Sequence, residues 1–69
     1  MKDFKFVSLE TLHKEFKKRE KDHRKSTRDQ FLAFDPKRRV YIAVDNRTFD
    51  FFMEEFKTHD EAVTWLQQD

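Results

Sequence analysis

The chain has 69 residues, of which 42% are charged and 36% hydrophobic, and its net charge at pH 7 is +1. This length accommodates one domain, which we expect over residues 1–69, and nine phenylalanines exclude the aromatic-poor composition of disordered segments. The absence of cysteine excludes disulfides and thiolate metal sites, and the absence of glycine excludes glycine-rich phosphate loops.

Residues 4–7 (FKFV) are the first predicted element, a short edge strand in which Phe and Lys alternate. A helix is predicted to begin after Ser8, because serine is a favoured N-cap and Leu12 stands at the far position of a hydrophobic staple. Leu12 and Phe16 belong to one narrow apolar stripe at helical spacing, so the helix is predicted to extend to about His23.

The segment after this stripe is entirely polar. Residues 17–30 contain no apolar side chain, and no glycine or proline either. Because nothing there can anchor the chain to a core, residues 24–29 are predicted to be a mobile charged connection within the domain.

A β-hairpin is predicted at residues 31–44. The stretches FLAF and VYIAV are short and rich in residues that favour strands. Between them, DPKR at residues 35–38 suits a type I turn, with Asp at the first position and Pro at the second. A second turn is predicted at residues 45–48, where Asn46 is the residue expected to take a positive φ.

Residues 48–56 leave two alternatives open. Phe49, Phe52, Met53 and Phe56 have the spacing of a helical stripe, whereas the composition and the preceding turn favour a strand. A strand is our prediction.

The last predicted element is a helix. It follows a capping box that begins at Thr58, and it extends to about Gln68. Together the elements predict an α+β fold of order (β)-α-β-β-β-α, in which three strands form an antiparallel meander and both helices make one layer on one sheet face. Phe16, Ile42 and Trp65 are the apolar anchors of three of these elements, and we expect all three to be buried.

Three resemblances follow from these patterns. The order α-β-β-β-α resembles the double-stranded-RNA-binding domain, whose last helix begins with phosphate-gripping lysines; here that position reads THDEAV, which is acidic, so that function is not implied. EEFKTHDEAVTWL is similar to the strand-then-helix ending of the arm-type DNA-binding domains of tyrosine recombinases. The whole chain resembles the small, charged, Phe-rich proteins of low-GC Gram-positive bacteria and their phages, which implies a mobile-element origin.

The histidines His13, His23 and His59 show no metal-binding or catalytic pattern. No two of them form the i,i+4 pair of a helical zinc site, and no cysteine assists. A layered domain of this size also has little room for a concave active site. We therefore predict no enzymatic activity, no metal site and no cofactor.

The strongest charge feature is a basic ridge, in which Lys and Arg recur at helical spacing along the first predicted helix and beyond it. The ridge consists of Lys14, Lys17, Lys18, Lys21, Arg24, Lys25 and Arg28. The turn residues Lys37, Arg38 and Arg39 would extend the ridge if the fold brought them near. Two interpretations are open: contact with DNA or RNA, or a solvated helix face, which we favour.

Apolar residues on both sides of the predicted strands suggest a protein partner. With both helices on one sheet face, Tyr41 and Phe52 would remain on the other face as contact residues. We therefore expect a non-catalytic binding or adaptor module, whose partner is another protein or a second copy in a two-fold dimer. A nucleic-acid-binding accessory protein is the alternative. No apolar run has the length of a membrane span, so no membrane partner and a cytoplasmic location are expected.

Overall fold

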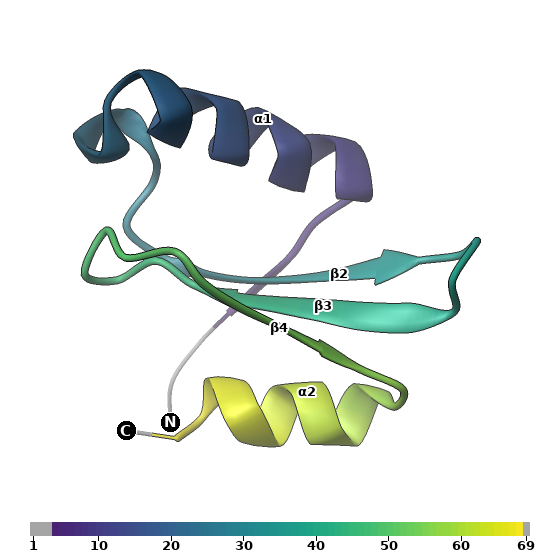
Figure 1. The fold of residues 1–69 in the computed structure, drawn as a ribbon. Helices are drawn as coiled ribbons and strands as arrows, with labels where there is room; N and C mark the ends of the chain where they lie inside the picture. Colours follow the sequence, from purple (N-terminus) through teal and green to yellow (C-terminus); the bar gives the residue numbers. More distant parts are fainter. Residues whose placement is uncertain (1–3, 69) are drawn as a thin grey trace.

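The computed structural model describes residues 4–68. Its elements, shown in Figure 1, are β1 (Lys5–Phe6), α1 (Leu9–Lys21), the 3₁₀ turn η1 (His23–Lys25), β2 (Gln30–Asp35), β3 (Val40–Asp45), β4 (Phe52–Phe56) and α2 (His59–Leu66). The α+β class and the predicted order of strands and helices are confirmed, including the strand in the ambiguous segment before α2.

The sheet has four strands in the order β1-β2-β3-β4. β2, β3 and β4 form the predicted antiparallel meander, whereas β1 runs parallel to β2, with Lys5 opposite Phe31. The predicted sheet of three antiparallel strands is therefore one strand too small. A two-residue strand carries almost no periodic signal, and its parallel pairing depends on the crossover through α1.

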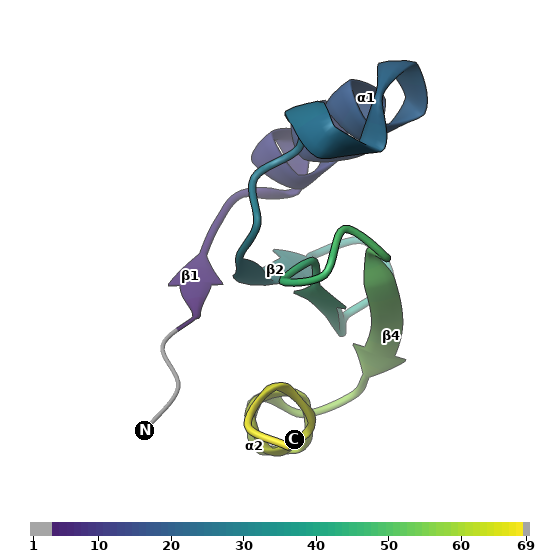
Figure 2. The same cartoon turned by 90° about the vertical axis from the view of Figure 1, so that its left-hand side faces the viewer.

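The two helices lie on opposite faces of the sheet, α1 above it and α2 below it in Figure 1, and Figure 2 shows the same layers from the side. The prediction that both helices share one face is wrong. The reason lies in β2 and β3, which are apolar on both faces: Phe31 and Ile42 pack on the α1 side, and Leu32 and Ala43 on the α2 side. Strands that are buried on both faces need a cover on each of them.

The sheet separates two hydrophobic clusters. The cluster on the α1 side comprises Leu12, Phe31, Ala33, Ile42, Val44 and Phe51. The cluster on the α2 side comprises Leu32, Ala43, Ala62 and Leu66.

Only one of the three residues expected to be buried is fully so. Ile42 is buried, Trp65 is half-buried at the margin of its cluster, and Phe16 is 42% exposed. Of the four strands, β2 lies nearest to the backbone of α1, and only one line of the helix reaches the core. Leu12 occupies that line, and Phe16, one turn later, lies beside it.

Both helices begin where the capping residues predict. The Thr11 N–H donates to Ser8 Oγ at 3.1 Å, and the Glu61 N–H donates to Thr58 Oγ1 at 3.2 Å. α1 ends at Lys21, two residues before the predicted end, because Asp22 leaves the helical conformation and η1 follows.

Residues 24–29 connect α1 to β2, and buried contacts hold the middle of this segment. Asn46 Nδ2 donates to Ser26 Oγ at 2.8 Å and to the Thr27 carbonyl at 2.9 Å. The Asn46 N–H donates to the Asp29 carbonyl at 2.8 Å. Mobility of the segment stays a prediction, and these contacts lead us to expect it at Arg24 and Lys25 rather than throughout.

Three residues with side chains take a left-handed backbone conformation, since the chain has no glycine for these positions: Arg39 (φ 55°), Phe49 (φ 65°) and Phe51 (φ 53°). Asn46, the residue expected to take a positive φ, does not. Its side chain is instead buried against Ser26 and Thr27. Left-handed conformations cost about 1–2 kcal/mol for a residue with a Cβ atom, and such strain tends to gather at functional sites.

Candidate functional site

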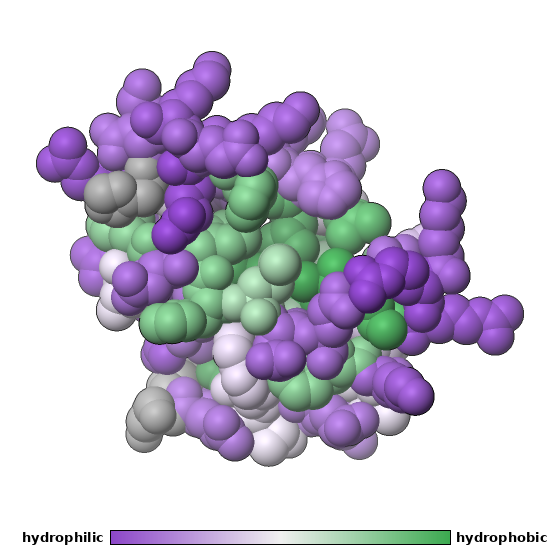
Figure 3. Space-filling model, viewed as in Figure 1, coloured by the Kyte–Doolittle hydropathy of each residue, from purple (hydrophilic) through white to green (hydrophobic). Residues whose placement is uncertain are grey.

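An apolar groove of about 360 Å³ opens between α1 and β4. One wall of the groove comes from α1, and the other comes from β3, β4 and the loop before β4. Figure 3 shows the hydrophobic surface that continues below the charged side chains of α1. The apolar lining consists of Leu9, Leu12, Phe16, Ile42, Phe51 and Met53.

Two aromatic rings form the centre of the groove. Phe16 from α1 and Phe51 from the loop before β4 meet edge to face, with ring centroids 5.7 Å apart. The Arg19 guanidinium lies 5.8 Å from the Phe51 ring and donates to the Asp50 carbonyl at 3.2 Å. The ring of Phe51 is thus contacted both by an aromatic ring and by a guanidinium group. Met53, which is 53% exposed, forms the β4 wall.

An ion pair closes the polar end of the groove. The Arg38 guanidinium donates to both carboxylate oxygens of Glu55, at 2.7 and 2.5 Å. These hydrogen bonds hold the pKa of Glu55 below its ordinary value and raise that of Arg38. The pair is exposed to water, so it supplies local structure more than stability.

The neighbouring edge of the sheet is open. β4 is the last strand, and it pairs with β3 alone. Among residues 4–68, no other backbone hydrogen bond reaches residues 52–56. Glu54, in the middle of this edge, is exposed and makes no ion pair within the described chain.

The structure separates the two predicted protein-contact residues. Tyr41 is half-buried under α2, between Phe34 at 4.9 Å and His59 at 5.7 Å between ring centroids. Phe52 is 58% exposed at the other end of the β3–β4 ladder, where it pairs with Asp45. Both lie on the α2 face, where Tyr41 is partly covered and Phe52 is exposed.

Sequence reasoning missed the groove residues. Helical spacing assigns Phe16 to the core, and Phe51 and Met53 fall within the ambiguous segment before the last helix. The available signal was the apolar pattern of residues 49–56 itself, because Phe51 lies outside the helical stripe and the apolar residues fall on both faces of a strand.

The basic ridge is partly occupied by contacts within the chain. Lys18 lies 3.0 Å from Glu15 and Lys14 3.7 Å from Glu10, and Arg24 pairs with Asp22. Arg28 donates to the Arg47 carbonyl at 2.8 Å and stacks over Phe49. The side chains of Lys17, Lys21 and Lys25 have no partner within residues 4–68.

The hairpin turn does not extend the ridge. Residues 37–39 lie at the end of the molecule near the start of α1, whereas η1 and the end of α1 lie at the opposite end in Figure 1. Lys37 and Arg39 are exposed, and Arg38 is engaged by Glu55. The ten basic residues therefore form two separate groups.

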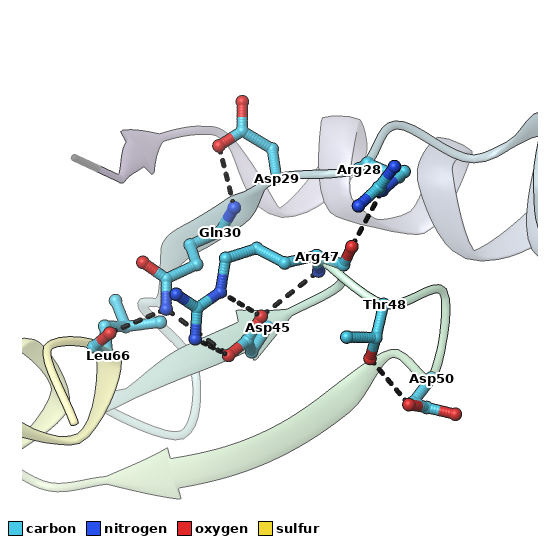
Figure 4. A network of polar contacts seen from close by, with 8 residues as sticks. All are labelled: Arg28, Asp29, Gln30, Asp45, Arg47, Thr48, Asp50 and Leu66. Atoms are coloured by element: carbon cyan, nitrogen blue, oxygen red, sulfur yellow. Dashed lines mark hydrogen bonds and ion pairs between the residues drawn. The ribbon is translucent and has the colours of Figure 1, made fainter. Parts of the chain in front are cut away.

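A polar network, drawn in Figure 4, links α2 to the sheet. Gln30 Nε2 donates to the Leu66 carbonyl at 2.6 Å and lies 3.4 Å from Asp45 Oδ2. Arg47 donates to both Asp45 oxygens, at 3.0 and 2.7 Å, and holds the pKa of Asp45 below its ordinary value. Each carboxylate oxygen of Asp45 is thus occupied, and the network stabilises the fold.

Glu15 is a buried carboxylate on the sheet side of α1. Its Oε1 accepts the Thr27 N–H at 3.0 Å, and its Oε2 lies 3.0 Å from Lys18 Nζ. Burial raises the pKa of Glu15, but the interactions with Thr27 and Lys18 outweigh this effect and leave the pKa below its ordinary value.

Glu15 should therefore make stability depend on pH in acid. Because its folded-state pKa is lower than its unfolded-state pKa, its contribution is complete above the unfolded value and is lost as pH falls through the folded one. Glu15→Gln is expected to cost about 1–3 kcal/mol at pH 7, and this difference from the unmodified protein should shrink below about pH 4.5. Urea unfolding at several pH values measures it.

The matched control is Glu10→Gln, which changes an exposed glutamate on the same helix. It should leave the pH dependence of unfolding nearly unchanged. If the free energy of unfolding depended on pH in the same way in both variants, the role given to Glu15 would be contradicted.

Comparison of the chain with protein-family models, curated proteins and solved structures found no match. The resemblances drawn from the sequence therefore stay predictions. Within residues 4–68, no group of three or more His, Asp or Glu side chains is arranged to hold a metal ion. No helix in that range combines the length and apolarity needed to cross a membrane.

Proposed function

We propose that the protein is a non-catalytic binding module that engages a protein partner through the groove between α1 and β4. One observation carries this proposal: Phe16 and Met53 are 42% and 53% exposed on the walls of a single apolar groove. Contiguous apolar surface of this kind, rimmed by polar residues, is typical of protein interaction sites.

The polar groups of the groove support binding better than catalysis. A catalytic base or nucleophile needs a hydrogen-bonded partner that orients it and a free position beside it for substrate. Arg38 and Glu55 occupy each other, and the imidazole of His13 on α1 makes no hydrogen bond within the described chain. The strained Phe51 fits the same view, because its left-handed backbone presents an aromatic ring to the groove.

The first test places a photoreactive phenylalanine analogue at Phe16. On irradiation in an extract of the producing cells, this variant is expected to form a covalent adduct with a protein, because the side chain contacts whatever fills the groove. Adding Met53→Glu should reduce the adduct at least about tenfold, since binding would bury an unpaired charge. Gel electrophoresis and mass spectrometry measure the adduct and identify the partner.

The matched control carries the same analogue at Lys17, the adjacent position, which is exposed outside the groove. It should give little adduct. Equal yields at the two positions, both insensitive to Met53→Glu, would refute the groove as the binding site.

Nucleic acid is the second candidate partner, favoured by the exposed ammonium groups of Lys17, Lys21 and Lys25, which have no partner within residues 4–68. Phosphate contacts release counterions, so the affinity for duplex DNA would fall steeply with salt. A steep dependence that Lys21→Gln flattens, together with no protein adduct at Phe16, would support this candidate over the groove.

A further inference from the structure

The open edge of β4 lies directly beside the groove. Four of its five residues, 52–55, are exposed, and Figure 2 shows the strand at the margin of the sheet with α2 below it. Every second residue of an edge strand directs its N–H and C=O groups away from the sheet, where they can pair with a further strand. Extended peptides bind many proteins in this way.

We propose, building on the groove as the binding site, that the partner adds an extended segment to β4 as a fifth strand, and that this segment alternates apolar and basic side chains. Backbone hydrogen bonds to β4 supply affinity in this arrangement. The two faces of β4 supply specificity, because alternate side chains of an added strand fall on opposite faces.

The α1 face selects the apolar side chains. Met53 and Glu55 lie on this face, because they pair with Val44 and Ile42, which belong to the core cluster on the α1 side. A side chain placed beside Met53 enters the groove toward Phe16. Glu55 is neutralised by Arg38, so this face presents no unpaired charge to the added strand.

The α2 face selects the basic side chains. Phe52, Glu54 and Phe56 lie on this face, since they pair with Asp45, Ala43 and Tyr41. Glu54 is exposed and has no ion-pair partner within the described residues, and Phe52 beside it is 58% exposed. A Lys or Arg opposite Glu54 gains a counter-charge, and its aliphatic stem covers the Phe52 ring.

The same charge disfavours a second copy of the chain as the occupant. Antiparallel pairing of two β4 strands about Glu54 would place Glu54 directly against its equivalent. Like charges at opposed positions destabilise a strand pair, so the edge favours a basic segment over another β4.

The probe for this proposal is a capped eight-residue peptide of alternating Val and Lys, with a fluorescent label for anisotropy titration. It is expected to bind at least about tenfold more tightly than the matched peptide of Val and Glu. Glu54→Lys should reverse this order. Glu20→Lys, an equal charge change at an exposed position on α1, should preserve it.

N-methylation of the peptide tests backbone pairing separately from charge. One peptide carries methyl groups on the backbone nitrogens of its Val residues, and a second carries them on the backbone nitrogens of its Lys residues. Each leaves every side chain unchanged but removes the backbone N–H donors along one edge of the peptide. One of the two methylated peptides is expected to lose at least about tenfold in affinity while the other retains binding, because only one edge faces β4.

The outcomes separate this proposal from the proposed function. Both methylated peptides could bind as well as the parent peptide, while Met53→Glu still abolishes peptide binding. Strand addition to β4 would then be wrong, and the groove would remain the binding site. If no peptide binds, or the charge order is the same for Glu54→Lys as for the unmodified protein, the fifth-strand proposal fails whatever the Phe16 adduct shows. Self-association that Glu54→Lys abolishes would identify a second copy as the occupant and would also overturn it.

Discussion

Leu32→Ala is expected to cost about 2–5 kcal/mol, which is most of the stability of a small domain that has about 5 kcal/mol to lose. Leu32 is fully buried in the centre of β2, where it packs with Ala43, Ala62 and Leu66. Ala43 and Ala62 are too small, and Leu66 is already too closely packed, to fill the space that the isobutyl group of Leu32 leaves. A cavity would therefore remain. Urea unfolding followed by circular dichroism measures the loss.

Phe34→Ala is the matched control, two residues along the same strand and on the same face. Phe34 is a larger side chain, but it is 36% exposed and contacts Tyr41 at the margin of the cluster. We expect the smaller side chain to cost more on deletion because it is the more buried one. A greater loss for Phe34→Ala would contradict the core described for the α2 side.

Asn46→Ala is the second substitution with a large expected effect. It removes the hydrogen bonds that the Asn46 amide donates to Ser26 Oγ and to the Thr27 carbonyl, and the loss of each such bond costs about 0.5–1.5 kcal/mol. Ser26 and Asn46 are both buried, so solvent has poor access to replace these bonds. We expect a lower unfolding midpoint and faster amide exchange at Thr27, measured by NMR.

Thr48→Ala provides the comparison, because Thr48 belongs to the same loop but its hydroxyl bonds to Asp50 at the surface. Its effect should stay within about 0.5 kcal/mol. Unchanged exchange at Thr27 in the Asn46 variant would mean that the connection from α1 to β2 is held by other contacts.

The features that sequence predicted correctly depend on residues close together in the chain. Ser8 and Thr58 cap their helices through bonds that span three residues, and Asp35 accepts the Lys37 N–H within the predicted hairpin turn. Such contacts need no knowledge of the rest of the fold. The hairpin and both helix starts were therefore predictable.

The sequence-based prediction placed the helical layers wrongly, although residues 31–34 and 40–44 carry a signal for the correct arrangement. These strands are apolar at almost every position, which is typical of strands covered on both faces. The prediction instead used the simplest arrangement, in which both helices form one layer on a single face of the sheet. That choice leaves Tyr41 on an open face, whereas the structure places α2 over it.

The candidate site depends on contacts between distant residues, which explains why sequence reasoning missed it. Phe16 meets Phe51, Arg38 meets Glu55, and Asn46 holds Ser26, and the members of each pair are 17 to 35 positions apart in the chain. Hydrophobic periodicity assigns both Leu12 and Phe16 to the buried stripe. The tilt and position of α1 on the sheet decide that Leu12 is buried and Phe16 is exposed.

The strand order also bears on how the chain folds. Pairings within β2, β3 and β4 join segments that follow one another, whereas β1 reaches β2 only after the chain has passed through α1, with Lys5 opposite Phe31. Closing that long loop costs entropy before a two-residue ladder returns any free energy. We therefore expect the meander of residues 30–56 to form first, and β1 to dock last and to be released first.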